Sequence, residues 1–114
     1  MQAVFHLIAL ILLHAHASLQ DEPDIEGVAF AEVQSCQGCQ LRGLPEVKSF
    51  IFEDVPLYGE NVVFKKVQGA PPELILYDGE NKELKRIALR EYTRRGCNEL
   101  MELYGFKKRE KSEL

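Results

Sequence analysis

Residues 28–39 have the sequence Val-Ala-Phe-Ala-Glu-Val-Gln-Ser-Cys-Gln-Gly-Cys, and the other elements of the chain can be placed around this stretch. Its first half, 28–33, is short, mostly apolar and largely β-favouring, which is typical of a buried strand. Its second half ends in a pair of cysteines, Cys36 and Cys39, separated by two residues. A helical pattern comes directly after them. The stretch therefore predicts a strand that delivers two cysteines to the start of a helix.

The region after the cysteines has the apolar spacing of a helix. Most of its apolar residues recur at intervals of three positions, and they are Leu41, Leu44, Val47, Phe50 and Ile51. Pro45 lies inside this stripe. It either kinks one continuous helix or is the first-turn residue of a second helical segment.

Three further strands and another helix follow. The strands are expected at 62–67, 73–77 and 83–87, and the Asp-Gly turn at 78–81 joins the last two as a hairpin. Thr93 is the expected N-cap of the final helix, and Gly105 is its expected end. This helix has an apolar stripe formed by Cys97, Leu100, Met101 and Tyr104.

The order strand, helix, strand, strand, strand, helix constrains the topology. A helical crossover makes the first two strands parallel, and the short turn makes the last two antiparallel. We therefore expect an α/β fold with a four-stranded mixed sheet and helices packed on it. The folded domain is expected at 27–106, after an acidic leader at 18–26 and before a charged tail at 107–114.

The N-terminus resembles a secretory signal peptide at 1–17. It has an apolar run at 7–13 followed by the small-residue pattern Ala15-His16-Ala17. A core helix is the alternative interpretation of this segment. The apolar run is too short to span a membrane, which takes about 18 residues or more. We therefore expect a chain that enters the secretory pathway and has no membrane span.

Composition excludes several chemistries. The chain has 114 residues and a net charge of −4, so it forms one small domain without a basic field for nucleic acid. All three histidines lie within the first sixteen residues and leave with the signal peptide. The remaining chain has no histidine for a Ser-His-Asp or Cys-His mechanism or for a Cys/His zinc site. We expect no cofactor and no metal.

The two paired cysteines are the candidate catalytic residues. At a helix N-terminus, unpaired N–H groups and the helix dipole stabilise a thiolate. One thiolate attacks a substrate disulfide, and the other cysteine resolves the mixed disulfide. We assign the attack to Cys36, and Gly38 allows the tight turn. A structural disulfide, half of a zinc site and two buried thiols are the alternatives.

Two other residues bear on this site. Pro72 comes just before the third strand, and in redox folds of this type such a proline often faces the dithiol and helps to hold an extended substrate. A stiff loop that starts a strand is the equal alternative. Cys97 lies on an apolar helical stripe, so we expect it to be a core residue.

The chain ends in Lys111-Ser112-Glu113-Leu114, which resembles the Lys-Asp-Glu-Leu retrieval signal of the endoplasmic reticulum. Together with a signal peptide, this ending predicts retention in the endoplasmic-reticulum lumen through the retrieval receptor. Ordinary secretion is the alternative.

The sequence resembles the family of endoplasmic-reticulum selenoproteins that comprises selenoprotein M and the fifteen-kilodalton selenoprotein, which have a thioredoxin-like fold. The likeness covers about residues 33–106 and includes Cys36-x-Gly38-Cys39-Gln40-Leu41, Glu46-Val47-Lys48-x-Phe50, Asp54-x-Pro56-x-Tyr58 and Gly69-Ala70-x-Pro72-Glu73-Leu74. The family's selenocysteine falls on Cys39, so the chain resembles a cysteine-containing member. The order in which its two cysteines react stays open.

These observations predict a thioredoxin-like thiol–disulfide oxidoreductase, expected to be a monomer, that acts on protein thiols or disulfides. The alternative is a non-catalytic binding or folding-factor adaptor module whose disulfide is structural or regulatory.

Overall fold

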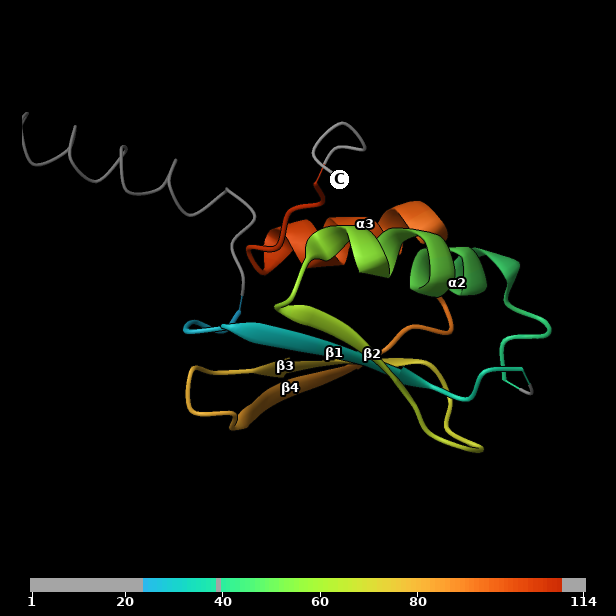
Figure 1. Cartoon of the computed structure of the whole chain (residues 1–114), viewed down its shortest axis with the longest axis horizontal. Coiled ribbons are helices and arrows are strands. Elements are labelled where there is room, and N and C mark those ends of the chain that lie inside the picture. The colour runs from blue at the N-terminus through green and yellow to red at the C-terminus, as the bar shows by residue number, and fades with distance from the viewer. Residues whose placement is uncertain (1–23, 39, 110–114) are drawn as a thin grey trace, which may run out of the picture.

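A computed structural model describes residues 24–38 and 40–109. A single four-stranded sheet forms one layer, and the helices lie on one face of it (Figure 1). The strands are β1 (Phe30–Ser35), β2 (Val62–Lys66), β3 (Glu73–Tyr77) and β4 (Glu83–Ala88). The helical layer consists of α2 (Pro45–Ser49), a π-helical turn η1 (Phe50–Asp54), a 3-10 turn η2 (Val55–Tyr58) and α3 (Arg94–Leu103).

The strand order is β2-β1-β3-β4, so β1 lies in the interior of the sheet. β1 pairs with β2 in parallel and with β3 antiparallel, and β3 pairs with β4 antiparallel. The predicted α/β fold with a mixed four-stranded sheet is confirmed. The other strands match their predicted ranges to within one residue, but β1 runs from Phe30 to Ser35, two residues later at each end than predicted. Polar Gln34 and Ser35 weaken the apolar signal, while the backbones of both residues still pair with β2.

The core lies between the sheet and the helical layer. Alternate residues of the central strands form the sheet side of the core, and residues of the helices form its other side. Each of its central side chains is at most 1% exposed, and these are Ala31, Val33, Leu41, Val47, Phe50, Ile51, Leu74, Leu76, Leu89, Cys97 and Met101.

The crossover between β1 and β2 is not one continuous helix. Residues 40–43 form a turn, and α2 begins only at Pro45, in the first helical turn. Leu44, which precedes this proline, has φ −129° and ψ 66°, because the proline ring disfavours a helical conformation at the residue before it. Of the two alternatives for Pro45, the structure shows the start of a second segment.

The boundaries of α3 agree with the sequence prediction. The Thr93 hydroxyl accepts a hydrogen bond from the Gly96 N–H at 3.0 Å, as an N-cap does. At the other end Gly105 has φ +93° and donates to the Glu102 carbonyl, while Phe106 donates to the Met101 carbonyl. This pair of bonds is a Schellman motif, which favours glycine at the left-handed position.

The N-terminal part of the described chain is connected to β4 and to the residue that follows α3. The Asp24 carboxylate pairs with the Lys85 ammonium and accepts a hydrogen bond from the Tyr104 hydroxyl at 2.8 Å. Only residues 24–26 of the predicted leader are described. The predicted signal peptide at 1–17 and the retrieval-like residues at 111–114 lie outside the described residues. Within 24–38 and 40–109, no helix is both long and apolar enough to cross a membrane.

Candidate redox site

Three segments meet at the carboxyl end of β1 (Figure 1). Cys36 follows β1 directly, residues 67–72 connect β2 to β3, and residues 89–93 connect β4 to α3. Backbone hydrogen bonds tie these segments together. The Cys36 N–H donates to the Ala70 carbonyl at 2.9 Å, and the Leu89 N–H donates to the Pro72 carbonyl at 3.0 Å. The topology thus brings Cys36 beside the loop that contains Pro72.

Cys36 itself is held closely. Its carbonyl accepts a hydrogen bond from the Ser35 hydroxyl at 2.9 Å, and the Ser35 carbonyl accepts one from the Val67 N–H at 3.0 Å. Cys36 is only 3% exposed. The next two residues, Gln37 and Gly38, are exposed. The site therefore has a buried sulfur beneath an exposed segment of loop.

The Cys36 sulfur accepts a hydrogen bond from the Gln40 backbone N–H, with a sulfur-to-nitrogen distance of 2.7 Å. A sequence-based expectation placed this sulfur at a helix N-terminus, whereas the regular helix begins nine residues later at Pro45. The donor comes instead from the turn at 40–43. A backbone N–H directed at the sulfur is the kind of donor that the start of a helix would also offer.

The remaining predicted site residues have different surroundings. The Pro72 side chain is less than 2% exposed, so its ring packs in the interior and not at the surface. Gly38 has open space where a Cβ would be placed. Cys39 lies outside the described residues. The roles of Gly38 and Pro72 in substrate binding remain predictions.

Comparison with known proteins identifies the family. A model described as the Sep15/SelM redox domain matches residues 31–106, about two thirds of the chain. The chain belongs to the Sep15/SelM family. Selenoprotein M of Eriocheir sinensis is 44% identical over 107 residues, which cover 94% of this chain and 79% of that protein. Selenoprotein M of Homo sapiens is 40% identical over 107 residues, which cover 91% of this chain and 73% of that protein.

The family assignment confirms the resemblance that the sequence motifs indicated. It also agrees with the α/β, thioredoxin-like sheet, because the matched range begins within β1 and ends just after α3. The Sep15/SelM chain has a redox-related function.

The third cysteine of the Sep15/SelM domain is a core residue, as its position on an apolar stripe predicted. Cys97 is 0% exposed and lies on the face of α3 that packs against the core. Burial raises the pKa of its thiol to about 12, and the nearby Asp54 carboxylate adds to this increase. Cys97 is therefore a neutral thiol at physiological pH.

A buried carboxylate connects the two helical segments, and the sequence analysis did not identify it. Asp54 in η1 is 3% exposed. Its two oxygens accept hydrogen bonds from the Arg94 guanidinium at 2.8 and 3.0 Å and from the Asn98 amide at 2.9 Å. The Tyr58 hydroxyl donates to Asn98 at 2.6 Å. The available signal was an acidic residue on the apolar stripe, three and four positions after Ile51 and Phe50.

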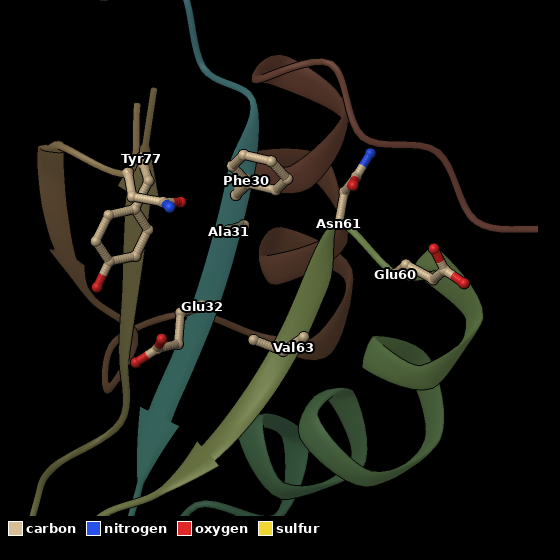
Figure 2. Close-up of a pocket in the computed structure, with 8 residues that line it drawn as sticks. Phe30, Ala31, Glu32, Glu60, Asn61, Val63 and Tyr77 are labelled. Carbon is tan, nitrogen blue, oxygen red and sulfur yellow. The ribbon is translucent and has the colours of Figure 1, made fainter. Parts of the chain in front are cut away.

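Two pockets bear on binding. One of about 350 Å³ lies on the sheet face that the helices leave uncovered, near the start of β1 (Figure 2). Cys36 follows the other end of this strand. It is lined by Phe30, Ala31, Glu32, Glu60, Asn61, Val63, Tyr77 and Asn81. Another of about 240 Å³ borders the turn that contacts the Cys36 sulfur, and its lining includes Gly43, Leu44, Pro45, Arg90 and Tyr92. This second pocket shares Gly43 with the turn, but neither Cys36 nor Gln40 lines it.

In the part of the chain that the structure describes, no group of three or more His, Cys, Asp or Glu side chains is arranged to hold a metal ion.

Proposed function

We propose that this chain is a thiol–disulfide oxidoreductase that acts on protein disulfides through Cys36 and Cys39. The observation that carries the proposal is the 2.7 Å hydrogen bond from the Gln40 N–H to the Cys36 sulfur, in a domain whose family has a redox function. A donor at this position lowers the free energy of a thiolate, and the thiolate is the reactive form in disulfide exchange.

The exchange proceeds in two steps. One cysteine thiolate attacks a substrate sulfur, forming a mixed disulfide, and the second substrate sulfur leaves as a thiolate that takes up a proton. The other cysteine thiolate then attacks the mixed disulfide and releases the first substrate sulfur. Two electrons pass to the substrate, and the Cys36–Cys39 disulfide forms. An external thiol such as glutathione reduces it again, and the same steps in reverse oxidise a substrate dithiol.

The burial of Cys36 bears on the order of attack. A side chain that is 3% exposed is poorly placed to meet a disulfide on another protein. We therefore propose that Cys39 attacks first and Cys36 resolves, which reverses the assignment made from the sequence. The Cys36→Ser variant should then capture mixed disulfides, and Cys39→Ser should capture few. Capture by Cys39→Ser alone would restore the original order. Both variants are made with Cys97→Ala to remove the third thiol.

The redox potential of the Cys36–Cys39 pair tests the function itself. A potential between about −180 and −270 mV supports an oxidoreductase, because known enzymes of this class have such values. A potential below about −300 mV indicates an inert structural bridge. That result would support the alternative, a non-catalytic binding or adaptor module, and would refute the proposal.

We also propose that the protein resides in the endoplasmic-reticulum lumen. The predicted signal peptide and the terminal Lys111-Ser112-Glu113-Leu114 support this location. Removing residues 111–114 should send the protein into the culture medium, whereas Ser112→Asp, which gives the common form of the signal, should keep it in the cell. Retention of the truncated chain would show that these residues are not the signal.

A further inference from the structure

We propose that Ser35 is a positioning residue that fixes the Cys36 sulfur against the Gln40 N–H. The inference rests on the proposed dithiol function. Ser35 and Asp54 are the two buried polar residues of the described chain. Asp54 connects η1 to α3. Ser35 instead contacts a residue of the redox site.

The position of Ser35 is one where an apolar side chain is expected. It is the last residue of β1, on the same side of the strand as Ala31 and Val33, which pack in the core. Ser35 is 0% exposed. A hydroxyl at such a position is unfavourable unless it is hydrogen-bonded. Here the hydroxyl is satisfied by donating to the Cys36 carbonyl at 2.9 Å.

This bond completes the restraint of the Cys36 backbone. The Cys36 N–H is already held by the Ala70 carbonyl at 2.9 Å. With the Ser35 hydroxyl on its carbonyl, Cys36 is held at both of its backbone polar atoms. The torsion ψ of Cys36 sets the orientation of this carbonyl, so the Ser35 hydroxyl restrains that torsion.

The same torsion controls the contact made by the sulfur. The Gln40 N–H, which belongs to the fourth residue after Cys36, lies 2.7 Å from the Cys36 sulfur. Because ψ of Cys36 orients the chain that follows, rotation about it moves the Gln40 N–H relative to the sulfur and lengthens this contact. Ser35 thus acts through Cys36, and its hydroxyl stabilises the thiolate form and with it the reduced dithiol. Loss of the hydroxyl should make the site more reducing.

The test is Ser35→Ala in the full chain. We expect the equilibrium constant for reduction of the Cys36–Cys39 disulfide by glutathione to fall about tenfold, which corresponds to a potential about 30 mV more negative. In a Cys39→Ser background, the fraction of Cys36 thiolate at pH 7, followed by its ultraviolet absorbance, should fall in parallel. Cys97 does not interfere, because burial raises its pKa to about 12.

Two controls separate positioning from stability. Val33→Ala removes core volume from the same face of β1 without touching the polar atoms of Cys36, so it should lower stability and leave the potential unchanged. Ser35→Thr keeps the hydroxyl and should restore the potential to within about twofold in the equilibrium constant. An equal shift in Val33→Ala and Ser35→Ala would overturn the proposal.

A second variant keeps the test informative if Ser35→Ala does not fold. Gln40→Pro removes the N–H that contacts the sulfur and should produce the same tenfold fall. An unchanged potential in Gln40→Pro refutes the positioning role. If the wild-type pair itself does not behave as a reversible couple, the proposed function fails. If it does and both variants match it, only the role of Ser35 fails.

Discussion

Replacing Asp54 by asparagine removes the charge from a carboxylate that is 3% exposed and joins η1 to α3. The carboxylate accepts two hydrogen bonds from the Arg94 guanidinium, at 2.8 and 3.0 Å, and one from Asn98. In the asparagine variant, one of the oxygens becomes an NH₂ group that faces other donors. The variant therefore leaves a buried amide in a site built for an acceptor.

The loss in free energy of unfolding can be estimated from these contacts. A hydrogen bond to a charged group contributes about 1.5 to 3 kcal/mol. The Arg94 side chain is 44% exposed, so solvent screening reduces the contribution of each bond by roughly half. We expect Asp54→Asn to lower the free energy of unfolding by about 2 to 3 kcal/mol. For a domain of this size, that corresponds to a fall in Tm of about 10 to 20 °C.

The pH dependence of this stability difference tests whether the charge of Asp54 is its cause. Hydrogen bonds from Arg94 hold the pKa of Asp54 below its usual value. A depressed pKa contributes stability above the unfolded value of about 3.9, and this contribution is lost as pH falls through the folded value. The difference in stability between wild type and Asp54→Asn should therefore be full at pH 7 and should shrink below about pH 4.

The assay is urea unfolding followed by circular dichroism across this pH range. The matched control is Glu53→Gln, which alters the neighbouring carboxylate of the same Arg94 pair, but at a side chain that is 61% exposed. We expect less than about 0.5 kcal/mol from the control. A pH-independent difference for Asp54→Asn, or an equal loss in the control, would refute the reasoning.

Three further predictions concern single residues. Cys97 should stay unalkylated by iodoacetamide at pH 8 in the native protein, since its pKa is raised to about 12, and should react fully in denaturant; mass spectrometry distinguishes the two. Gly105→Ala should lower the free energy of unfolding by about 1 to 2 kcal/mol because φ is +93°, whereas Gly43→Ala should be neutral because open space surrounds Gly43. Thr93→Ala should cost about 1 kcal/mol by loss of the N-cap, and Thr93→Ser should not; equal losses would show that the hydroxyl is not the cause.

Much of the fold was predictable because its determinants are local. The Asp-Gly turn fixes the hairpin, and β3 has the predicted bounds. Thr93 and Gly105 mark the ends of α3 through contacts within a few residues of each. The helical crossover then makes β1 and β2 parallel. Each of these features depends on neighbours in the sequence.

The site was less predictable because its determinants are distant in sequence. The burial of Cys36 depends on residues 67–72, which a local pattern does not place beside it. Asp54 and Arg94 are 40 residues apart, so the sequence alone did not pair them. The start of α2 also stayed open, because the apolar spacing favoured a helix that begins before Pro45 whereas the proline favoured a start at Pro45. In the structure α2 begins at Pro45, because the proline keeps Leu44 out of the helical conformation.

The interior position of β1 has a consequence for cooperativity. Both edges of this strand are hydrogen-bonded, to β2 and to β3, so freeing it breaks two ladders at once. Partial unfolding that starts from the edge strands β2 and β4 leaves the interior strands β1 and β3 until last. We expect the amides of β1 to exchange with deuterium only through global unfolding, while those of 37–38 and 40–43 exchange by local opening. The proposed redox cycle would then proceed directly after a strand that does not open, and any rearrangement it requires would be confined to the residues after β1.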